Sequence, residues 1–289
     1  MQKTEIFTMT NKEVVKNFYY SDSLKLDIRL NTWKKFGTNK KSFIEWILGM
    51  MNLKGNPNLR LLDVGCGTGD LLYAASKIND NLKIYGVDIS KAMIYRTKIK
   101  NFKFKKNFIV GEAEKIPFNS AFFDRLVSVH TLHHVPNIKK AIKEFYRVIK
   151  PGGLIIIVTG NYNLDKGFNK LHYQLLKKLN FPSFMLEKDD YLRFSGSRAL
   201  QYFLDLNIPV TKCRYTNNLN FRSVKPALDY YKSAMMYRNS MGLNDVRIKK
   251  SQWQELTAEM ELKISGIIKR NGSFVVPGEV SAYKIIKNV

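Results

Sequence analysis

The sequence predicts an α/β fold in which a doubly wound parallel sheet is covered by helices on both faces. Three observations predict it. Short, continuously apolar strands alternate with helical patterns through the first half of the chain, as in sheets with both faces buried. A glycine-rich turn at 65–69 joins the first such strand to the next helix. The chain has 289 residues, 45% hydrophobic and 25% charged, the ordinary balance of one large globular domain.

The elements of the first half follow from hydrophobic periodicity and from local start and stop signals. Ser90 can cap the helix after the second strand, and Pro151-Gly152-Gly153 stops the helix before the fifth strand. The periodicity predicts helices over 24–36, 42–51, 70–78 and 138–149, another after Ser90, and strands over 59–64, 83–88, 107–110, 125–129 and 154–159.

The second half of the chain is more helical. Its helix candidates are 166–179, 198–206, 224–236 and 251–269, and two β-rich pieces, 210–217 and 274–287, interrupt them. No internal repeat, low-complexity segment or interdomain linker is visible. We therefore expect a single domain over 1–289.

Composition excludes several classes of protein. Two cysteines, Cys66 and Cys213, are too few for a disulfide framework or a structural zinc site. No apolar run approaches the roughly 20 residues that span a bilayer, and the N-terminus does not resemble a signal peptide. We therefore expect a soluble, cytoplasmic protein without a transmembrane segment.

The net charge of +24 allows two interpretations. A basic chain suits a polyanionic partner such as nucleic acid or a membrane surface. Most of these basic residues are lysines, however, and asparagine is also abundant, as the proteins of an AT-rich genome would show. Arginine would be the more telling residue for phosphate or base recognition.

The glycine turn reads Asp63-Val-Gly-Cys-Gly-Thr-Gly69. Glycines there let the backbone approach a ligand closely. The spacing is not that of the NAD fingerprint, and no Gly-Lys-Ser/Thr follows, so a P-loop is excluded. The second strand ends in Asp88, about twenty residues further on, where a carboxylate suits the two hydroxyls of a ribose. A helix cap is the alternative for Asp88.

Four motifs in register resemble the class I S-adenosylmethionine-dependent methyltransferases, of the small-molecule type related to the ubiquinone and menaquinone methyltransferases. They are Asp63–Gly69, Gly86–Ser90, Gly111–Phe118, and Phe123–His130 continuing to Arg147–Gly153. The match covers about residues 59–160. The resemblance implies a seven-stranded, mostly parallel, Rossmann-like sheet with helical lid insertions. It also implies S-adenosylmethionine as cofactor, S-adenosylhomocysteine as product and methyl transfer as the reaction.

The resemblance also implies the cofactor-binding residues. Gly65 and Gly67 line the methionine moiety, and Asp63 orients the turn, which also contains Cys66 and Gly69. We assign Cys66 no redox or nucleophilic role. The remaining positions are Asp88 at the ribose hydroxyls, Ile89 and Met93 on the adenine, Glu112, Ala113 and Glu114 beside the adenine edge, Ser128 facing the methyl group, and Arg29, which either pairs with the methionine carboxylate or lies on a solvated helix face.

Three of the four histidines, His130, His133 and His134, follow the fourth strand beside the methyl site that the resemblance implies. Histidine titrates near neutrality, and a general base is needed for a poorly nucleophilic acceptor such as a phenol. These three are therefore the candidate catalytic residues, with orientation or packing as the alternative. No carboxylate or cysteine accompanies them at ligand spacing, so no metal is expected.

The rest of the chain bears on the acceptor. The resemblance places antiparallel edge strands in 207–220 and 273–289, around a cofactor-binding core at 55–160. The stretches 161–206 and 221–272 are then insertions that can form a lid. They are rich in aromatic residues and methionine, which suits a small apolar or aromatic acceptor methylated on oxygen, nitrogen or carbon. A helical subdomain core is the alternative, and a natural-product, peptide or lipid acceptor stays open.

Nucleic acid is the alternative partner. The fourth strand is not followed by the Asp/Asn-Pro-Pro-Tyr/Phe pattern of enzymes that methylate base amines. The densest basic run, 98–106, lies at the amino end of the third strand, opposite the cofactor cleft, whereas a nucleic-acid enzyme needs its positive field around the cleft. An RNA methyltransferase acting on tRNA or rRNA therefore remains the second hypothesis, and a non-catalytic binding module the third.

Overall fold

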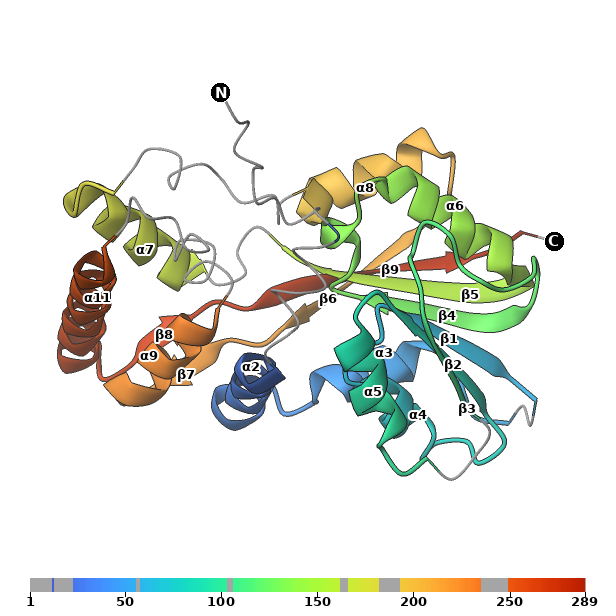
Figure 1. Ribbon diagram of the computed structural model, residues 1–289, viewed down its shortest axis with the longest axis horizontal. Coiled ribbons are helices and arrows are strands. Elements are labelled where there is room, and N and C mark those ends of the chain that lie inside the picture. Colours follow the sequence, from blue (N-terminus) through green and yellow to red (C-terminus); the bar gives the residue numbers. More distant parts are fainter. Residues whose placement is uncertain are drawn as a thin grey trace.

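A computed structural model describes residue 12 and residues 23–55, 58–102, 106–161, 166–181, 193–234 and 249–288. Seven strands form its main sheet, in the order β3-β2-β1-β4-β5-β9-β6 (Figure 1). The first five pair in parallel, and β9 is antiparallel to both β5 and β6. The strands are β1 (Arg60–Val64), β2 (Lys83–Asp88), β3 (Lys106–Val110), β4 (Phe123–Val129), β5 (Ile149–Gly160), β6 (Thr211–Thr216) and β9 (Glu279–Ile286). The predicted seven-stranded α/β fold is confirmed.

Helices cover both faces of this sheet (Figure 1). Side chains alternate along β5, so that Ile155 and Ile157 face one core, while Ile156 and Val158 face the other. The first core holds α6 (Ile138–Val148) and α8 (Gly196–Asp205), and the second holds α3 (Phe43–Met50), α4 (Asp70–Ala75) and α5 (Lys91–Lys98). Both faces of the parallel strands are therefore buried, which explains their continuous apolar runs.

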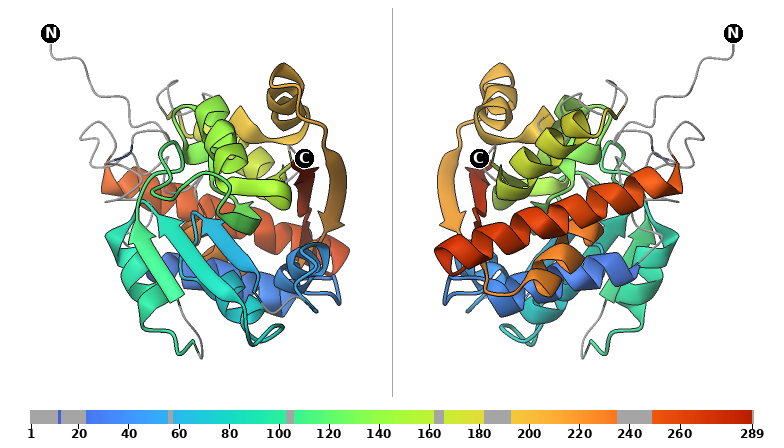
Figure 2. Two further views of the ribbon diagram at one scale, coloured as in Figure 1. Left: turned by 90° about the vertical axis from the view of Figure 1, so that its right-hand side faces the viewer. Right: turned by 90° about the vertical axis from the view of Figure 1, so that its left-hand side faces the viewer.

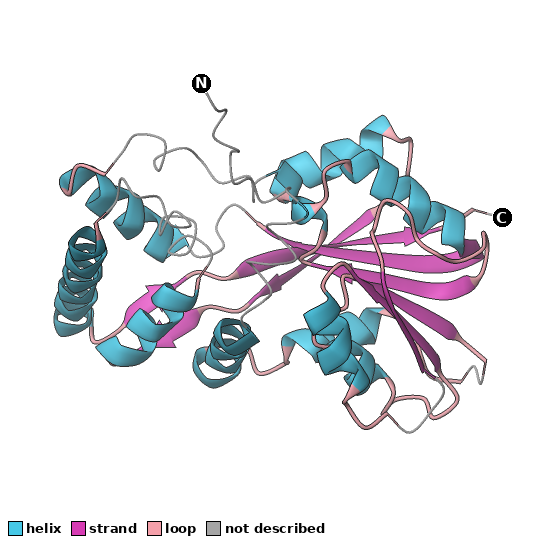
Figure 3. Ribbon diagram, viewed as in Figure 1, coloured by secondary structure: helices cyan, strands magenta, loops and turns pink. Residues whose placement is uncertain are grey.

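A third core lies beyond the end of β5, on the left in Figure 1. Three helices and a separate two-stranded sheet form it, and Figure 3 shows the two sheets apart. The long helix α11 lies against α7 and α9 (Figure 2). The elements are α7 (Lys166–Lys178), α9 (Val224–Ser233), α11 (Lys250–Asn271), β7 (Leu219–Phe221) and β8 (Phe274–Val276), with α2 (Ser23–Phe36) packed beside α9.

The structure corrects two predicted helix boundaries. The helix predicted to end at residue 149 ends at Val148, and Pro151-Gly152-Gly153 lies inside β5, because Ile149 already pairs with Phe123. The helix over 70–78 ends at Ala75. The β-rich piece 274–287 contains two strands in different sheets, β8 and β9, and β9 is the antiparallel strand expected there. Proline 277 between them has no N–H to donate to a ladder. The small sheet of β7 and β8 was not predicted.

The third core contains most of the described parts of the two predicted lid stretches. The exception is α8, whose side chains Ala199 and Phe203 pack with the sheet rather than with the third core. The lid role of these stretches stays a prediction, and residues 162–165, 182–192 and 235–248 of them lie outside the described part of the chain.

Candidate active site

The glycine turn follows β1 at the carboxyl end of the parallel strands. Gly65, Gly67 and Gly69 have φ angles of 78°, 53° and 73°, a region that residues with a side chain rarely adopt. The turn is fastened to the neighbouring strand, because the N–H groups of Gly65 and Cys66 donate to the Val87 carbonyl at 2.7 and 3.2 Å. The backbone of this turn therefore requires glycine at three positions.

Gly65 and Gly67 differ in what surrounds them. A Cβ at Gly65 would lie 2.6 Å from Cγ2 of Thr131, on the loop after β4, so β1 and β4 meet here without room for a side chain. A Cβ at Gly67 would have nothing within 4 Å. Gly67 therefore faces open space, where a ligand can approach the backbone.

Asp88, at the end of β2, accepts hydrogen bonds from the glycine turn and from the residue just before the next helix. Its Oδ2 accepts from the Gly67 N–H at 2.9 Å, and its Oδ1 accepts from the Ser90 N–H at 2.8 Å. The carboxylate is 8% exposed, and burial raises its pKa although these two N–H donors oppose the shift. The residue thus holds the glycine turn against the start of α5. Ser90 also caps α5 as predicted, its Oγ accepting from the Met93 N–H at 3.4 Å.

Asp63 and Cys66 lie inside the protein beneath the turn. Burial and the nearby charge of Asp88 raise the pKa of Asp63 to about 8. Oδ1 of Asp63 is buried and accepts no hydrogen bond from the described residues, a costly state for a carboxylate. Burial also raises the pKa of the Cys66 thiol. The thiol is therefore protonated at neutral pH.

The predicted adenine contacts lie in two places. Ile89 is half-buried, whereas Met93 is 1% exposed and already packed by the protein. Glu112 and Ala113, after β3, are half-buried, and Glu114 is buried. Ile89 and the Glu112–Glu114 segment therefore follow the ends of adjacent strands, since β2 and β3 are paired neighbours.

Lys12 is a residue of this site that sequence reasoning missed. Its Nζ lies 2.5 Å from Oε2 of Glu112 and 3.2 Å from Oε2 of Glu114. The other oxygen of Glu114 accepts from the Asn137 N–H at 2.9 Å. These carboxylates raise the pKa of Lys12. No local pattern marks a partner 100 positions away, so the contact is visible only in three dimensions.

Ser128 and Arg29, two of the predicted cofactor residues, lie in different environments. Ser128 is 1% exposed, and its hydroxyl donates to the Val64 carbonyl at 2.9 Å, so the side chain is used inside the sheet. Arg29, on α2, is half-buried, and its Nε is buried with no acceptor among the described residues. Its positive charge is close enough to lower the pKa of His130. Arg29 on α2 is therefore near the residue that follows β4.

The three candidate histidines occupy different environments. His130 directly follows β4, is half-buried and has a φ angle of 51°, a strained conformation for a residue with a side chain. Burial and then Arg29 lower its pKa to about 4. His133 and His134 are 4% and 8% exposed in the 3-10 turn Leu132–His134, and burial lowers the pKa of His133. His130 is thus the most accessible of the three and is neutral at pH 7.

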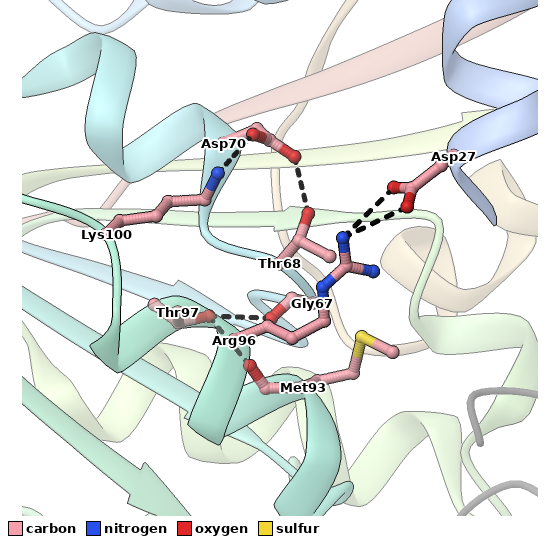
Figure 4. A network of polar contacts seen from close by, with 8 residues as sticks. All are labelled: Asp27, Gly67, Thr68, Asp70, Met93, Arg96, Thr97 and Lys100. Atoms are coloured by element: carbon pink, nitrogen blue, oxygen red, sulfur yellow. Dashed lines mark hydrogen bonds and ion pairs between the residues drawn. The ribbon is translucent and has the colours of Figure 1, made fainter. Parts of the chain in front are cut away.

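Three polar contacts join α5 and the residues just after it to their surroundings, and Figure 4 shows them together. They were not predicted. The Thr97 hydroxyl donates to the Gly67 carbonyl at 2.8 Å, and Lys100 Nζ lies 2.8 Å from Oδ1 of Asp70. Asp70 also accepts a hydrogen bond from Thr68. Arg96 Nη2 lies 3.2 and 3.1 Å from the two carboxylate oxygens of Asp27 on α2. Helix α5 therefore connects the glycine turn to α2.

Possible metal ligands, membrane-spanning helices and the basic run also bear on the function of this site. Among the described residues, no group of three or more histidine, cysteine or acidic side chains could hold a metal ion. Within the same residues, no helix is long and apolar enough to cross a membrane. Lys106 begins β3 at the amino edge of the sheet, as expected. Lys98, however, follows Thr97, which bonds to Gly67, and Lys100 pairs with Asp70, so the start of the basic run lies beside the glycine turn, contrary to the prediction.

Comparison with known proteins gives consistent findings. A family model described as a methyltransferase domain matches residues 62–157. The chain is 32% identical over 177 residues to the demethylmenaquinone methyltransferase of Staphylococcus aureus, covering 60% of this chain and 71% of that protein. It is 30% identical over 135 residues to the sterol 4-C-methyltransferase strm-1 of Caenorhabditis elegans, covering 45% of this chain but only 40% of that longer protein.

Among solved structures, the fold resembles phosphoethanolamine N-methyltransferase 2 of Haemonchus contortus in complex with S-adenosyl-L-methionine. The TM-score is 0.55 at 14% sequence identity, and the match covers 98% of this chain and 60% of that one. At this identity the likeness concerns the fold alone. It extends over the third core as well as the sheet, because nearly the whole chain is matched.

Proposed function

We propose a small apolar or aromatic metabolite as the methyl acceptor of this chain, which belongs to the class I S-adenosylmethionine-dependent methyltransferases. When bound, S-adenosylmethionine supplies a methyl group on a sulfonium, ready for in-line displacement. The chain's own residues then have three tasks: to bind the cofactor, to align the acceptor and to exclude water.

The residues at the glycine turn fit this cofactor. Gly67 faces open space, as close approach of a ligand to the backbone requires. The orphaned Oδ1 of Asp63 suits the cofactor's ammonium group, which would favour the ionised form of a carboxyl whose pKa is about 8. Asp88 retains lone pairs toward a ribose beside its two backbone donors.

Further residues complete the proposed cofactor site. The buried, unpaired Nε of Arg29 suits the methionine carboxylate. Ile89 is proposed against the adenine, with Glu112, Ala113 and Glu114 at its edge. We propose no direct cofactor contact for Ser128, Cys66 and Met93, because all three side chains are packed inside the protein.

An aromatic group beside His130 carries the acceptor proposal. The Phe43 ring lies 5.9 Å from the His130 ring and 6.0 and 5.6 Å from the rings of Trp46 and Tyr215. The Trp46 and Tyr215 rings are 5.1 Å apart. An aromatic wall next to the proposed methyl site favours a flat or apolar acceptor over a phosphate backbone. The acceptors named for the two relatives, a sterol and demethylmenaquinone, have the same character.

We propose His130 as the group that takes the acceptor's proton as the new bond to the methyl carbon forms. His130→Ala should lower kcat by about 10²-fold or more, the usual contribution of a general base, while the affinity for S-adenosylhomocysteine stays unchanged. Because its pKa of about 4 keeps the imidazole neutral, kcat of the native chain at saturating cofactor should be level from pH 6 to 8. Steady-state kinetics with calorimetric titration test both. Unaltered kcat in the variant would assign His130 to packing.

The function itself is tested in two steps. Calorimetric titration with S-adenosylhomocysteine should show binding that added bulk tRNA does not alter at low or moderate salt. The chain, given S-adenosylmethionine labelled on the methyl group, should then transfer label to quinols, sterols or phenols in a mixed acceptor panel, and not to tRNA. Failure to bind S-adenosylhomocysteine contradicts the enzyme. Label in tRNA alone would establish the RNA methyltransferase instead.

A further inference from the structure

We infer that Arg96 is a positioning residue for the cofactor: its ion pair with Asp27 holds α2 across the carboxyl end of β1, and this pair must open before the cofactor exchanges. The inference rests on the proposed cofactor site. The glycine motif does not contain Arg96; the geometry of α2 and α5 points to it.

The path of α2 supports this role. Strand β1 lies between β2 and β4 in the sheet. At its start α2 contacts α5, which follows β2, through Asp27 and Arg96. Two residues further along α2, Arg29 is near enough to His130, which follows β4, for its charge to lower the pKa of that histidine. The start of α2 therefore lies between the helix that follows β2 and the residue that follows β4, on the carboxyl side of β1.

Helix α5 transmits the position of α2 to the turn. Arg96 is followed by Thr97, whose hydroxyl bonds to the Gly67 carbonyl, and one turn later Lys100 pairs with Asp70 at the start of α4 (Figure 4). The Arg96 and Asp27 side chains are 31% and 38% exposed. This exposure to solvent allows the ion pair to break reversibly. Arg96 is also next to Thr97, which bonds to the Gly67 backbone that the cofactor would touch.

Two further observations support a role for ion pairs beside the proposed cofactor site. Nη1 of Arg96 is buried and has no acceptor among the described residues, so the guanidinium is fixed through Nη2 alone. Lys12 makes an independent contact of the same kind, with Glu112 and Glu114 beyond β3. Lys12 and Asp27, which precede the first strand, thus form ion pairs with residues that follow β3 and β2, on the adenosine side of the proposed site.

The test uses the full chain and tritiated S-adenosylhomocysteine in a chase experiment, with calorimetry for Kd. Arg96→Gln and Asp27→Asn should each raise Kd about fivefold through faster release, the size expected for a half-exposed ion pair. kcat at saturating cofactor should not change. High salt should speed release from the native chain more than from Arg96→Gln, because screening acts only where the pair exists.

A charge exchange separates positioning from mere structure. The double variant Asp27→Arg with Arg96→Asp should restore the release rate to within about twofold of native, since it re-forms one ion pair. Lys98→Gln, an exposed lysine on the same helix, controls for lost charge and should release at the native rate. A native release rate for Arg96→Gln, or no rescue by the double variant, would overturn the inference but not the proposed function. A native chain that binds no S-adenosylhomocysteine overturns both.

Discussion

Gly65→Ala is expected to lower the affinity for S-adenosylhomocysteine by about 100-fold or more, and the free energy of unfolding by about 2–4 kcal/mol. The left-handed φ of 78° at this position disfavours any Cβ. The added carbon would also lie 2.6 Å from Cγ2 and 2.9 Å from Cβ of Thr131. Relief requires moving either the glycine turn or the loop that begins with His130, and both belong to the proposed site.

Two other glycines serve as matched variants. Gly67→Ala meets no atom within 4 Å, so its stability loss should be the backbone strain alone, about 1–2 kcal/mol, although its methyl group enters the ligand space. Gly152→Ala has the same strain, with a φ of 71° and open surroundings, but lies in β5 away from the turn. It should bind the cofactor product normally. Chemical denaturation and calorimetry measure both quantities. Native affinity in Gly65→Ala would show that this turn tolerates displacement and does not hold the ligand.

Asp88→Ala is expected to weaken binding of S-adenosylhomocysteine by about 1–3 kcal/mol, or roughly 5- to 150-fold. The change removes the proposed ribose acceptor. It also leaves the N–H groups of Gly67 and Ser90 without their shared carboxylate, at the two places where turn and helix meet. Asp88→Asn should fall between native and alanine, because the amide retains one oxygen but adds a donor where acceptors are needed.

The control for Asp88 is Asp80→Asn, which removes one negative charge from an exposed position before β2. Its affinity should equal that of the native chain. The four proteins are compared by calorimetric titration at one salt concentration. An Asp88→Ala variant with native affinity would mean that the ribose lies elsewhere and that Asp88 is only a tie between the turn and α5.

Much of the cofactor half could be predicted because its signals are local. Strand β2 ends at Asp88 as expected, since an apolar run stops there at a charged residue and Ser90 begins a helix. The sheet and its antiparallel end are confirmed. Strand β7 was missed because three residues are too short for periodicity to register. Strand β8 begins the predicted β-rich piece 274–287, but its pairing with β7 had no signal in the sequence. The helix before β5 was extended by one residue because Ile149 suits either element.

The site was predictable in part for a similar reason. A motif names the residues of a turn, but it does not say which side chains the sheet will use for itself. The Ser128 hydroxyl bonds to the Val64 carbonyl on the neighbouring strand, and Met93 is already packed. Lys12, Asp27 and Arg96 had no signal, because each meets a partner 69 to 102 positions away. Ion pairs of that separation depend on the fold and not on spacing along the chain.

The place of β9 has a consequence for synthesis of the protein. Strand β9, residues 279–286, lies between β5 and β6, which precede it in the chain. On the ribosome, β1 to β5 can all pair once residue 160 has emerged, but β6 has no neighbour in the sheet until β9 is made. The edge of β5 stays open throughout the translation of the third core, and an unpaired strand edge is where nascent chains associate wrongly. The parallel half that carries the cofactor turn is therefore complete in strands before the antiparallel end can close.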